Sequence, residues 1–316
     1  MQGAPRQTPF TFEDPGGYRI YVYQWLPDPE TPPKAVVIIA HGMAEHAGRH
    51  GRLAERLTEA GYSVYAPDHR GHGRTAQSRE DLGYLGEDGF RAAVADLRQL
   101  HQIVKQKHPE LSVFLLGHSM GSFLVQHYIY RYGGDLQGAL LSGTCGDRGL
   151  ALYGGILLAK LIMRLKGPQS PSPFLQNLSF MGYNNGIRPR RTQFDWLSRD
   201  AAEVDRYLAD PLCGTICSAA FFHDLYRGLH DIRQRKNRRL IPSKIPLYLF
   251  SGDQDPVGSY TRTVRRLIST YRKLGLWDVT HRFYPGGRHE MLHETNREEV
   301  IADLITWLDR HVPATH

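Results

Sequence analysis

The pentapeptide GHSMG at residues 117–121 holds a serine whose surroundings favour a nucleophile. An apolar segment at 112–116 precedes it and a segment of helical periodicity follows, so we place Ser119 on a strand-to-helix turn. Such a turn needs small residues two positions before and after the serine, and it projects the hydroxyl above the carboxyl edge of a sheet. A serine in an ordinary turn is the alternative, because the pattern alone is short.

A serine hydroxyl needs a general base, and the chain has 16 histidines. With a nucleophile on a turn of this type the chain order is serine, acid, histidine, which favours late candidates. His289 follows two glycines and the last predicted strand, and His293 is the alternative base. The segment SGDQDPV offers two acids. We favour Asp255 as the acid that orients the histidine, whereas Asp253 could cap the turn.

A tetrahedral intermediate also needs two backbone donors for its oxyanion. One is the amide of Met120, the residue after the nucleophile. The other comes from the loop HGMAEH at 41–46, where Gly42 permits a close approach and Met43 is the expected donor. We expect His41 to anchor this loop through hydrogen bonds.

The letters HEMLH from His289 to His293 also match the zinc-protease pattern H-E-x-x-H. Zinc binding there requires both histidines on one face of a long helix, with a third ligand further along. Here two glycines precede the pattern and ETNREEV follows it, so we expect no metal. Phosphate-binding and dinucleotide-binding glycine motifs are absent, which predicts no nucleotide cofactor. No nucleic-acid-binding signature accompanies the basic composition, so we expect no nucleic-acid partner.

Alternating strands and helices position these residues. We predict strands at 35–40, 62–66, 112–116, 137–142, 246–251 and 279–284, and helices at 50–60, 89–108, 120–131, 259–273 and 296–311. This alternation indicates an α/β fold with a mostly parallel sheet covered by helices on both faces. Residues Tyr18 to Trp25 alternate in hydropathy and are predicted to form an antiparallel edge strand.

The alternation fails between Cys145 and Leu240, which predicts a core of residues 1–145 and 241–316 with an insertion at 146–240. The insertion begins with an apolar helix at 150–165, suited to lining an acyl tunnel, touching a membrane or packing onto the core. Residues 147–244 hold 16 Lys and Arg against 8 Asp and Glu, whereas the whole chain has a net charge of +7. This basic segment suits an anionic lipid surface or an acidic substrate, and a solvated basic face is the alternative.

Composition sets the broad class. The 316 residues, 41% of them hydrophobic, are enough for one large domain with an insertion. Three cysteines without paired spacing argue against a disulfide framework, and Cys213 and Cys217 would share one face if they lie on a helix. No secretory signal is visible, and the longest apolar stretch is too short and too charged to span a bilayer. We therefore expect a soluble cytoplasmic protein, able to associate with membranes through the insertion.

Five segments in this order carry a family resemblance: HGMAEHAGRH, APDHRGHGRT, GHSMGSFL, SGDQDPV and YPGGRHEML. Together they resemble the monoacylglycerol lipase and lysophospholipase group of α/β-hydrolases, also described as serine aminopeptidase-like. The resemblance implies the α/β-hydrolase fold with an inserted lid, the triad Ser119, Asp255 and His289, no cofactor, and hydrolysis of lipid-like esters. Two positions depart from the family pattern, with Ser122 in place of a second glycine and His50 in place of an aromatic residue.

Other functions share the same residues. A small-ester or aryl-ester hydrolase, or an aminopeptidase of short peptides, would use the same triad and differ only in the insertion. A non-catalytic binding protein on the same fold is the alternative of another class, because fold alone does not determine function. The sequence leaves the oligomeric state open.

Overall fold

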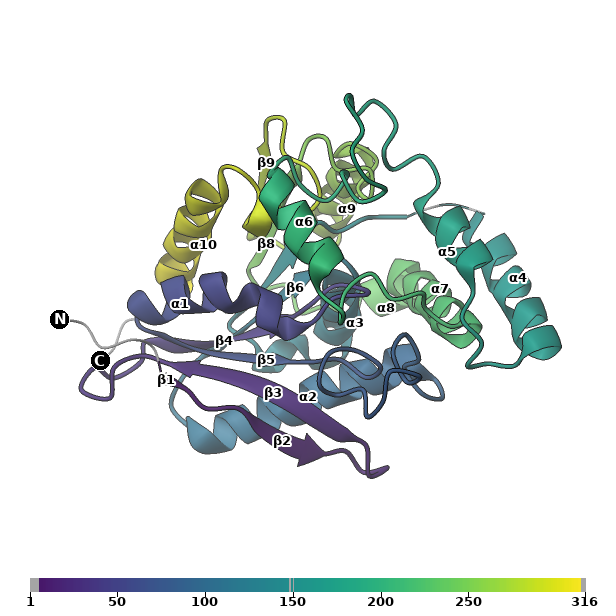
Figure 1. The fold of residues 1–316 in the computed structure, drawn as a ribbon. Helices are drawn as coiled ribbons and strands as arrows, with labels where there is room; N and C mark the ends of the chain where they lie inside the picture. Colours follow the sequence, from purple (N-terminus) through teal and green to yellow (C-terminus); the bar gives the residue numbers. More distant parts are fainter. Residues whose placement is uncertain (1–5, 148, 150, 314–316) are drawn as a thin grey trace.

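The computed structural model describes residues 6–147, 149 and 151–313. These residues form one mixed sheet whose strand order is β1-β3-β5-β4-β6-β7-β8-β9, with β2 paired to β3 (Figure 1). From β5 across to β9 every pairing is parallel. The strands are β1 (Arg6–Gln7), β2 (Phe10–Glu13), β3 (Arg19–Leu26), β4 (Ala35–Ala40), β5 (Tyr62–Pro67), β6 (Val113–His118), β7 (Gly138–Ser142), β8 (Leu247–Gly252) and β9 (Val279–Tyr284).

Helices cover both faces of this sheet. The core helices are α1 (Gly51–Glu59), α2 (Gly89–Lys107), α3 (Met120–Tyr132), α9 (Arg262–Lys273) and α10 (Arg297–His311). Helices α1 and α10 pack on one face, while α2, α3 and α9 pack on the other. The predicted α/β-hydrolase architecture is therefore confirmed.

The central strands are wholly apolar because they are buried on both faces. In β4, Val36 and Ile38 face one core, and Val37 and Ile39 face the other. All six residues of β4 are buried. The uninterrupted hydropathy of such a strand therefore reflects two apolar layers rather than one.

The prediction of an antiparallel edge strand is half right. Strand β3 pairs antiparallel with β5, but its other side is covered by β1 and β2. The prediction missed this covering because β2 has only four residues, FTFE, and alternates between half-buried and exposed positions. A short segment of that kind is difficult to distinguish from a loop.

Between β7 and β8 the described residues form helices and loops, with one isolated bridge from Pro171 to Ser218. The helices are α4 (Ala151–Lys166), α5 (Pro173–Phe180), α6 (Ala201–Ala209), α7 (Ala219–Arg233) and α8 (Arg235–Arg238), and α4, α5 and α7 gather beside the sheet (Figure 1). Helix α7 is anchored on the core. Asp224 accepts the Gly89 amide at 2.8 Å, and Arg91 bonds Asp231 at 2.8 Å. A Cβ on Gly228 would lie 2.4 Å from the Phe90 ring.

Within the described residues, no helix has the length and apolarity to cross a membrane.

Candidate active site

Ser119 lies between β6 and α3 in a backbone conformation that few residues adopt. Its φ is 51° and its ψ is −118°. The chain turns so tightly here that a Cβ on Gly117 would lie 2.4 Å from the Gly121 carbonyl oxygen. A Cβ on Gly121 would lie 2.0 Å from the Ala40 carbonyl oxygen of β4. Both glycines are therefore required for the strained turn that exposes the serine hydroxyl.

His289 joins the serine to a buried carboxylate. Its Nε2 lies 2.8 Å from the Ser119 hydroxyl oxygen, and its Nδ1 lies 3.0 Å from both carboxylate oxygens of Asp255. Asp255 is fully buried and also accepts the Val257 amide at 2.9 Å. The loops after β6, β8 and β9 meet at the carboxyl edge of the sheet and bring these three side chains together as a triad. The arrangement lets the histidine accept the serine proton while the carboxylate fixes its tautomer.

The electrostatic environment favours this role for the histidine. Burial disfavours the charged ring, but the Asp255 carboxylate outweighs burial and raises the pKa of His289 above its ordinary value. A base with a raised pKa holds the proton that it receives from the serine more firmly.

The two alternative residues have other partners. Asp253 accepts the Gly286 amide at 2.9 Å and so caps the turn after β9. His293 donates from Nε2 to the Arg49 carbonyl oxygen at 3.1 Å. Residues 291–293 form only a short 3-10 helix, so His289 and His293 do not form a pair on one helix face.

The loop at 41–46 lies against the serine. A Cβ on Gly42 would lie 3.2 Å from the Ser119 Cβ, and both Met43 and Met120 line the cavity above the serine. His41 anchors the loop as expected. Its Nδ1 donates to the Gly42 carbonyl oxygen at 2.7 Å, and its Nε2 accepts the His69 amide at 2.9 Å.

A buried ion-pair network behind this loop was not anticipated from the sequence. Arg49 bonds both oxygens of Glu290 at 2.8 Å and one oxygen of Glu45 at 2.6 Å. The other oxygen of Glu45 accepts the Gly42 amide at 2.6 Å. Burial would raise the pKa of Glu290, but Arg49 outweighs it and lowers that pKa to about 2. The network joins the loop at 41–46 to the residue after His289, and the segment HGMAEHAGR was its only sequence signal.

The insertion also supports this loop. The Ala44 carbonyl oxygen accepts the Tyr207 hydroxyl at 3.0 Å and the Gly214 amide at 2.9 Å. The Arg49 guanidinium lies over the Tyr207 ring, 4.9 Å from its centroid. The conformation of the loop at 41–46 therefore depends on α6 and the residues after it.

A cavity of about 470 Å³ opens above Ser119 and His289. Helices α3, α4, α5 and α7 contribute its walls, which include the apolar side chains of Leu152, Leu158, Phe222, Leu225 and Leu229. The cavity can hold an apolar chain with its reactive group beside the serine.

The three cysteines form no disulfide. Cys213 and Cys217 do not lie on a helix, so the condition for their sharing one helix face is not met; both lie in the loop between α6 and α7. This loop turns at Asp210, whose carbonyl oxygen accepts the Cys213 amide at 3.0 Å. Spacing of four residues was compatible with a helix, but the Pro211 and Gly214 of this segment favour a turn.

The comparisons with known proteins agree with this geometry. The family described as "Serine aminopeptidase, S33" matches residues 31–296. The monoacylglycerol lipase of Mycolicibacterium smegmatis is 33% identical over 96% of this chain and 97% of that protein. The monoglyceride lipase of Rattus norvegicus is 30% identical over 93% of both. A thermostable carboxyl esterase from Bacillus coagulans superposes with a TM-score of 0.89 at 27% identity, over 97% of this chain and 99% of that one.

Fold, triad and comparisons together define an α/β-hydrolase enzyme. The chain belongs to the serine aminopeptidase S33 family.

Proposed function

We propose that this protein hydrolyses carboxylic esters of lipid type, with monoacylglycerols as the leading substrate class. One observation carries the proposal: the 2.8 Å contact between His289 and the Ser119 hydroxyl opens onto a cavity whose lining is mostly apolar. The relatives named monoacylglycerol lipase and monoglyceride lipase support the substrate class.

The reaction follows from the contacts. Ser119 attacks the ester carbonyl as His289 Nε2 takes the hydroxyl proton, and the amides of Met43 and Met120 stabilise the oxyanion. His289 then protonates the leaving alcohol, which departs and leaves an acyl-enzyme on Ser119. Water attacks this intermediate by the same route and releases the fatty acid. Asp255 keeps its charge throughout and stabilises the imidazolium.

Residues 146–240 act as a lid in this proposal. Leu152 and Leu158 of α4 line the cavity, while Leu157, Leu161 and Leu165 of the same helix are 69%, 52% and 75% exposed. These three leucines recur every four residues and form an apolar stripe on the outer face of α4. Lys160 and the other basic residues of α4 lie beside the stripe. An exposed apolar stripe with basic neighbours suits contact with an anionic membrane surface.

Membrane contact is tested by co-sedimentation with vesicles of phosphatidylglycerol or of phosphatidylcholine. We expect preferential binding to the anionic vesicles, reduced by the double substitution Leu157→Ser and Leu161→Ser. Trp277→Ser is the matched control, because Trp277 is 72% exposed but lies in the loop between α9 and β9. Equal binding of wild type and the double variant would contradict the lid contact.

The substrate proposal is tested on monoacylglycerols, lysophospholipids, short aryl esters and aminoacyl amides, with Ser119→Ala as the control. We expect turnover to rise with acyl length and to be lost in the control. A flat profile from short to long p-nitrophenyl esters would favour a small-ester hydrolase, and turnover of the amides alone would favour a peptidase. Failure of a fluorophosphonate probe to label Ser119 would favour a non-catalytic binding protein.

A further inference from the structure

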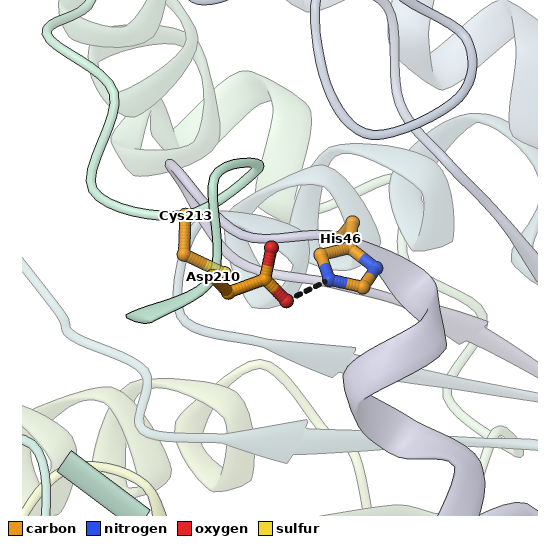
Figure 2. Close-up of side chains that lie close together, drawn as sticks. All are labelled: His46, Asp210 and Cys213. Carbon is orange, nitrogen blue, oxygen red and sulfur yellow. Dashed lines mark hydrogen bonds and ion pairs between the residues drawn. The ribbon is translucent and has the colours of Figure 1, made fainter. Parts of the chain in front are cut away.

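A second group of chemically reactive side chains lies at the end of the loop at 41–46. It consists of His46, Asp210 and Cys213, whose ligand-type atoms all lie within 4.8 Å of one another (Figure 2). His46 comes from the segment before α1, whereas Asp210 and Cys213 come from the loop after α6. Within the described ranges, no other three His, Cys, Asp or Glu side chains are grouped this closely in a way that could hold an ion.

His46 keeps one ring nitrogen that the fold does not use, and Asp210 is held in place by two hydrogen bonds. His46 Nε2 donates to Asp210 Oδ2 at 2.9 Å, while the buried Nδ1 of His46 has no hydrogen-bond partner in the described structure. Asp210 Oδ1 accepts the Leu212 amide at 2.9 Å, which fixes the carboxylate in place. A neutral histidine with a vacant ring nitrogen can move its proton to Nδ1 and present Nε2 to a ligand.

The charges of the group match a divalent cation. Asp210 would supply a carboxylate and Cys213 a thiolate, which is the form of cysteine that binds metals. Binding of a cation would release the thiol proton to solvent and leave these two negative charges against two positive charges.

We propose that His46, Asp210 and Cys213 form a binding site for a borderline-soft divalent cation such as Zn²⁺, distinct from the serine triad. Imidazole, carboxylate and thiolate are the three side chains that bind Zn²⁺ in proteins, at about 2.0 to 2.3 Å. Three donors leave a fourth position for water. The separation of up to 4.8 Å requires the side chains to move inward by about 1 Å.

A cation at this position would fasten the insertion to the loop at 41–46. His46 ends that loop, and the same stretch that carries Asp210 and Cys213 already bonds it through the Gly214 amide and the Ala44 carbonyl oxygen. His46 and Asp210 are 164 residues apart in the sequence. The cation would therefore cross-link two parts of the chain that separate on unfolding. Binding to the folded state alone raises thermal stability in proportion to the logarithm of cation concentration.

The test uses the full chain after treatment with EDTA, titrated with Co²⁺ as a spectroscopic probe and then with Zn²⁺ as the competitor. We expect one Co²⁺ per chain with a thiolate-to-metal charge-transfer band, displacement by Zn²⁺, and a higher unfolding temperature with Zn²⁺. The band should disappear in Cys213→Ser. His46→Asn and Asp210→Asn should each weaken the affinity by about tenfold or more, as expected for loss of a ligand.

Cys217→Ser is the matched control, because Cys217 lies in the same loop, is fully buried and is not part of the group. It should retain the charge-transfer band. Far-ultraviolet circular dichroism of each cation-free variant establishes folding. If Cys213→Ser is unfolded, the two variants that keep the thiol decide the question. Any of three results would overturn the proposal. The wild type could show no thiolate band, the His46 and Asp210 substitutions could leave the band unchanged, or the band could be lost only in Cys217→Ser.

Discussion

The substitution Asp255→Asn tests the triad most directly, because it removes one charge and keeps the size of the side chain. Each carboxylate oxygen of Asp255 lies 3.0 Å from His289 Nδ1. Both side chains are buried, so solvent does not screen the interaction. At an effective dielectric constant of about 20, two unit charges 3 Å apart attract by roughly 5 kcal/mol. This attraction stabilises the imidazolium that forms as Ser119 attacks.

A loss of about 5 kcal/mol in the transition state lowers the rate by about four orders of magnitude. The expected fall in kcat/KM is therefore about 10⁴-fold, comparable to the effect of the same change in other serine triads. The amide of the new asparagine also donates toward His289 Nδ1, which places the ring proton on Nε2, where it blocks removal of the serine proton. The assay is hydrolysis of a p-nitrophenyl ester across pH.

The pH profile gives the same test an independent readout. In the wild type, kcat/KM rises with pH as His289 loses its proton, and Asp255 holds that pKa above its ordinary value. Removing the carboxylate lowers the pKa, so the acidic limb should move to lower pH. Asp253→Asn is the matched control, since Asp253 caps the Gly286 turn, and should cost less than about tenfold. The assignment would be refuted if Asp255→Asn lowered kcat/KM by less than tenfold, or if Asp253→Asn lowered it by more than tenfold.

Two further predictions concern stability. Gly121→Ala places a Cβ 2.0 Å from a carbonyl oxygen of β4 and should lower the free energy of unfolding by several kcal/mol in urea titration, whereas Gly134→Ala, with nothing within 4 Å, should change it by less than about 1 kcal/mol. Arg49→Met leaves buried carboxylates without their cation and should cost about 3 to 5 kcal/mol, against about 0.5 kcal/mol or less for exposed Arg56→Met. Because the folded pKa of Glu290, about 2, lies below its value in the unfolded chain, its contribution is present above about pH 4.5 and is lost as pH falls toward 2. The Arg49→Met variant should not show this loss of stability on acidification. Equal acid sensitivity of the wild type and the variant would contradict the role of the ion pair between Arg49 and Glu290.

Local patterns predicted most of the core. Strand β4 occupies the predicted residues 35–40, because six consecutive apolar residues satisfy two cores at once. The order of strands and helices also indicated that the loops holding Ser119, Asp255 and His289 meet at one edge, and the structure brings these three side chains into hydrogen-bond contact. Parallel strands direct their carboxyl ends to the same edge, so this convergence needs no knowledge of packing detail.

Errors arose where local sequence permits two structures. FTFE at 10–13 is too short to reveal a strand that covers β3. The spacing of Cys213 and Cys217 left a helix and a turn both open, and the structure shows a loop.

Periodicity, together with the small residues that a tight turn requires, was enough to predict the parallel strands, the strained serine turn and the acid and base candidates. The pairing of Arg49 with Glu290, 241 residues away, and of His46 with Asp210, 164 residues away, is visible only in the folded structure. The loop after α6 brings Asp210 to His46, and α4, α5 and α7 line the cavity. A charge or a ligand atom acts over a few ångströms in space, so its partner is set by how distant loops pack and leaves no period in the sequence.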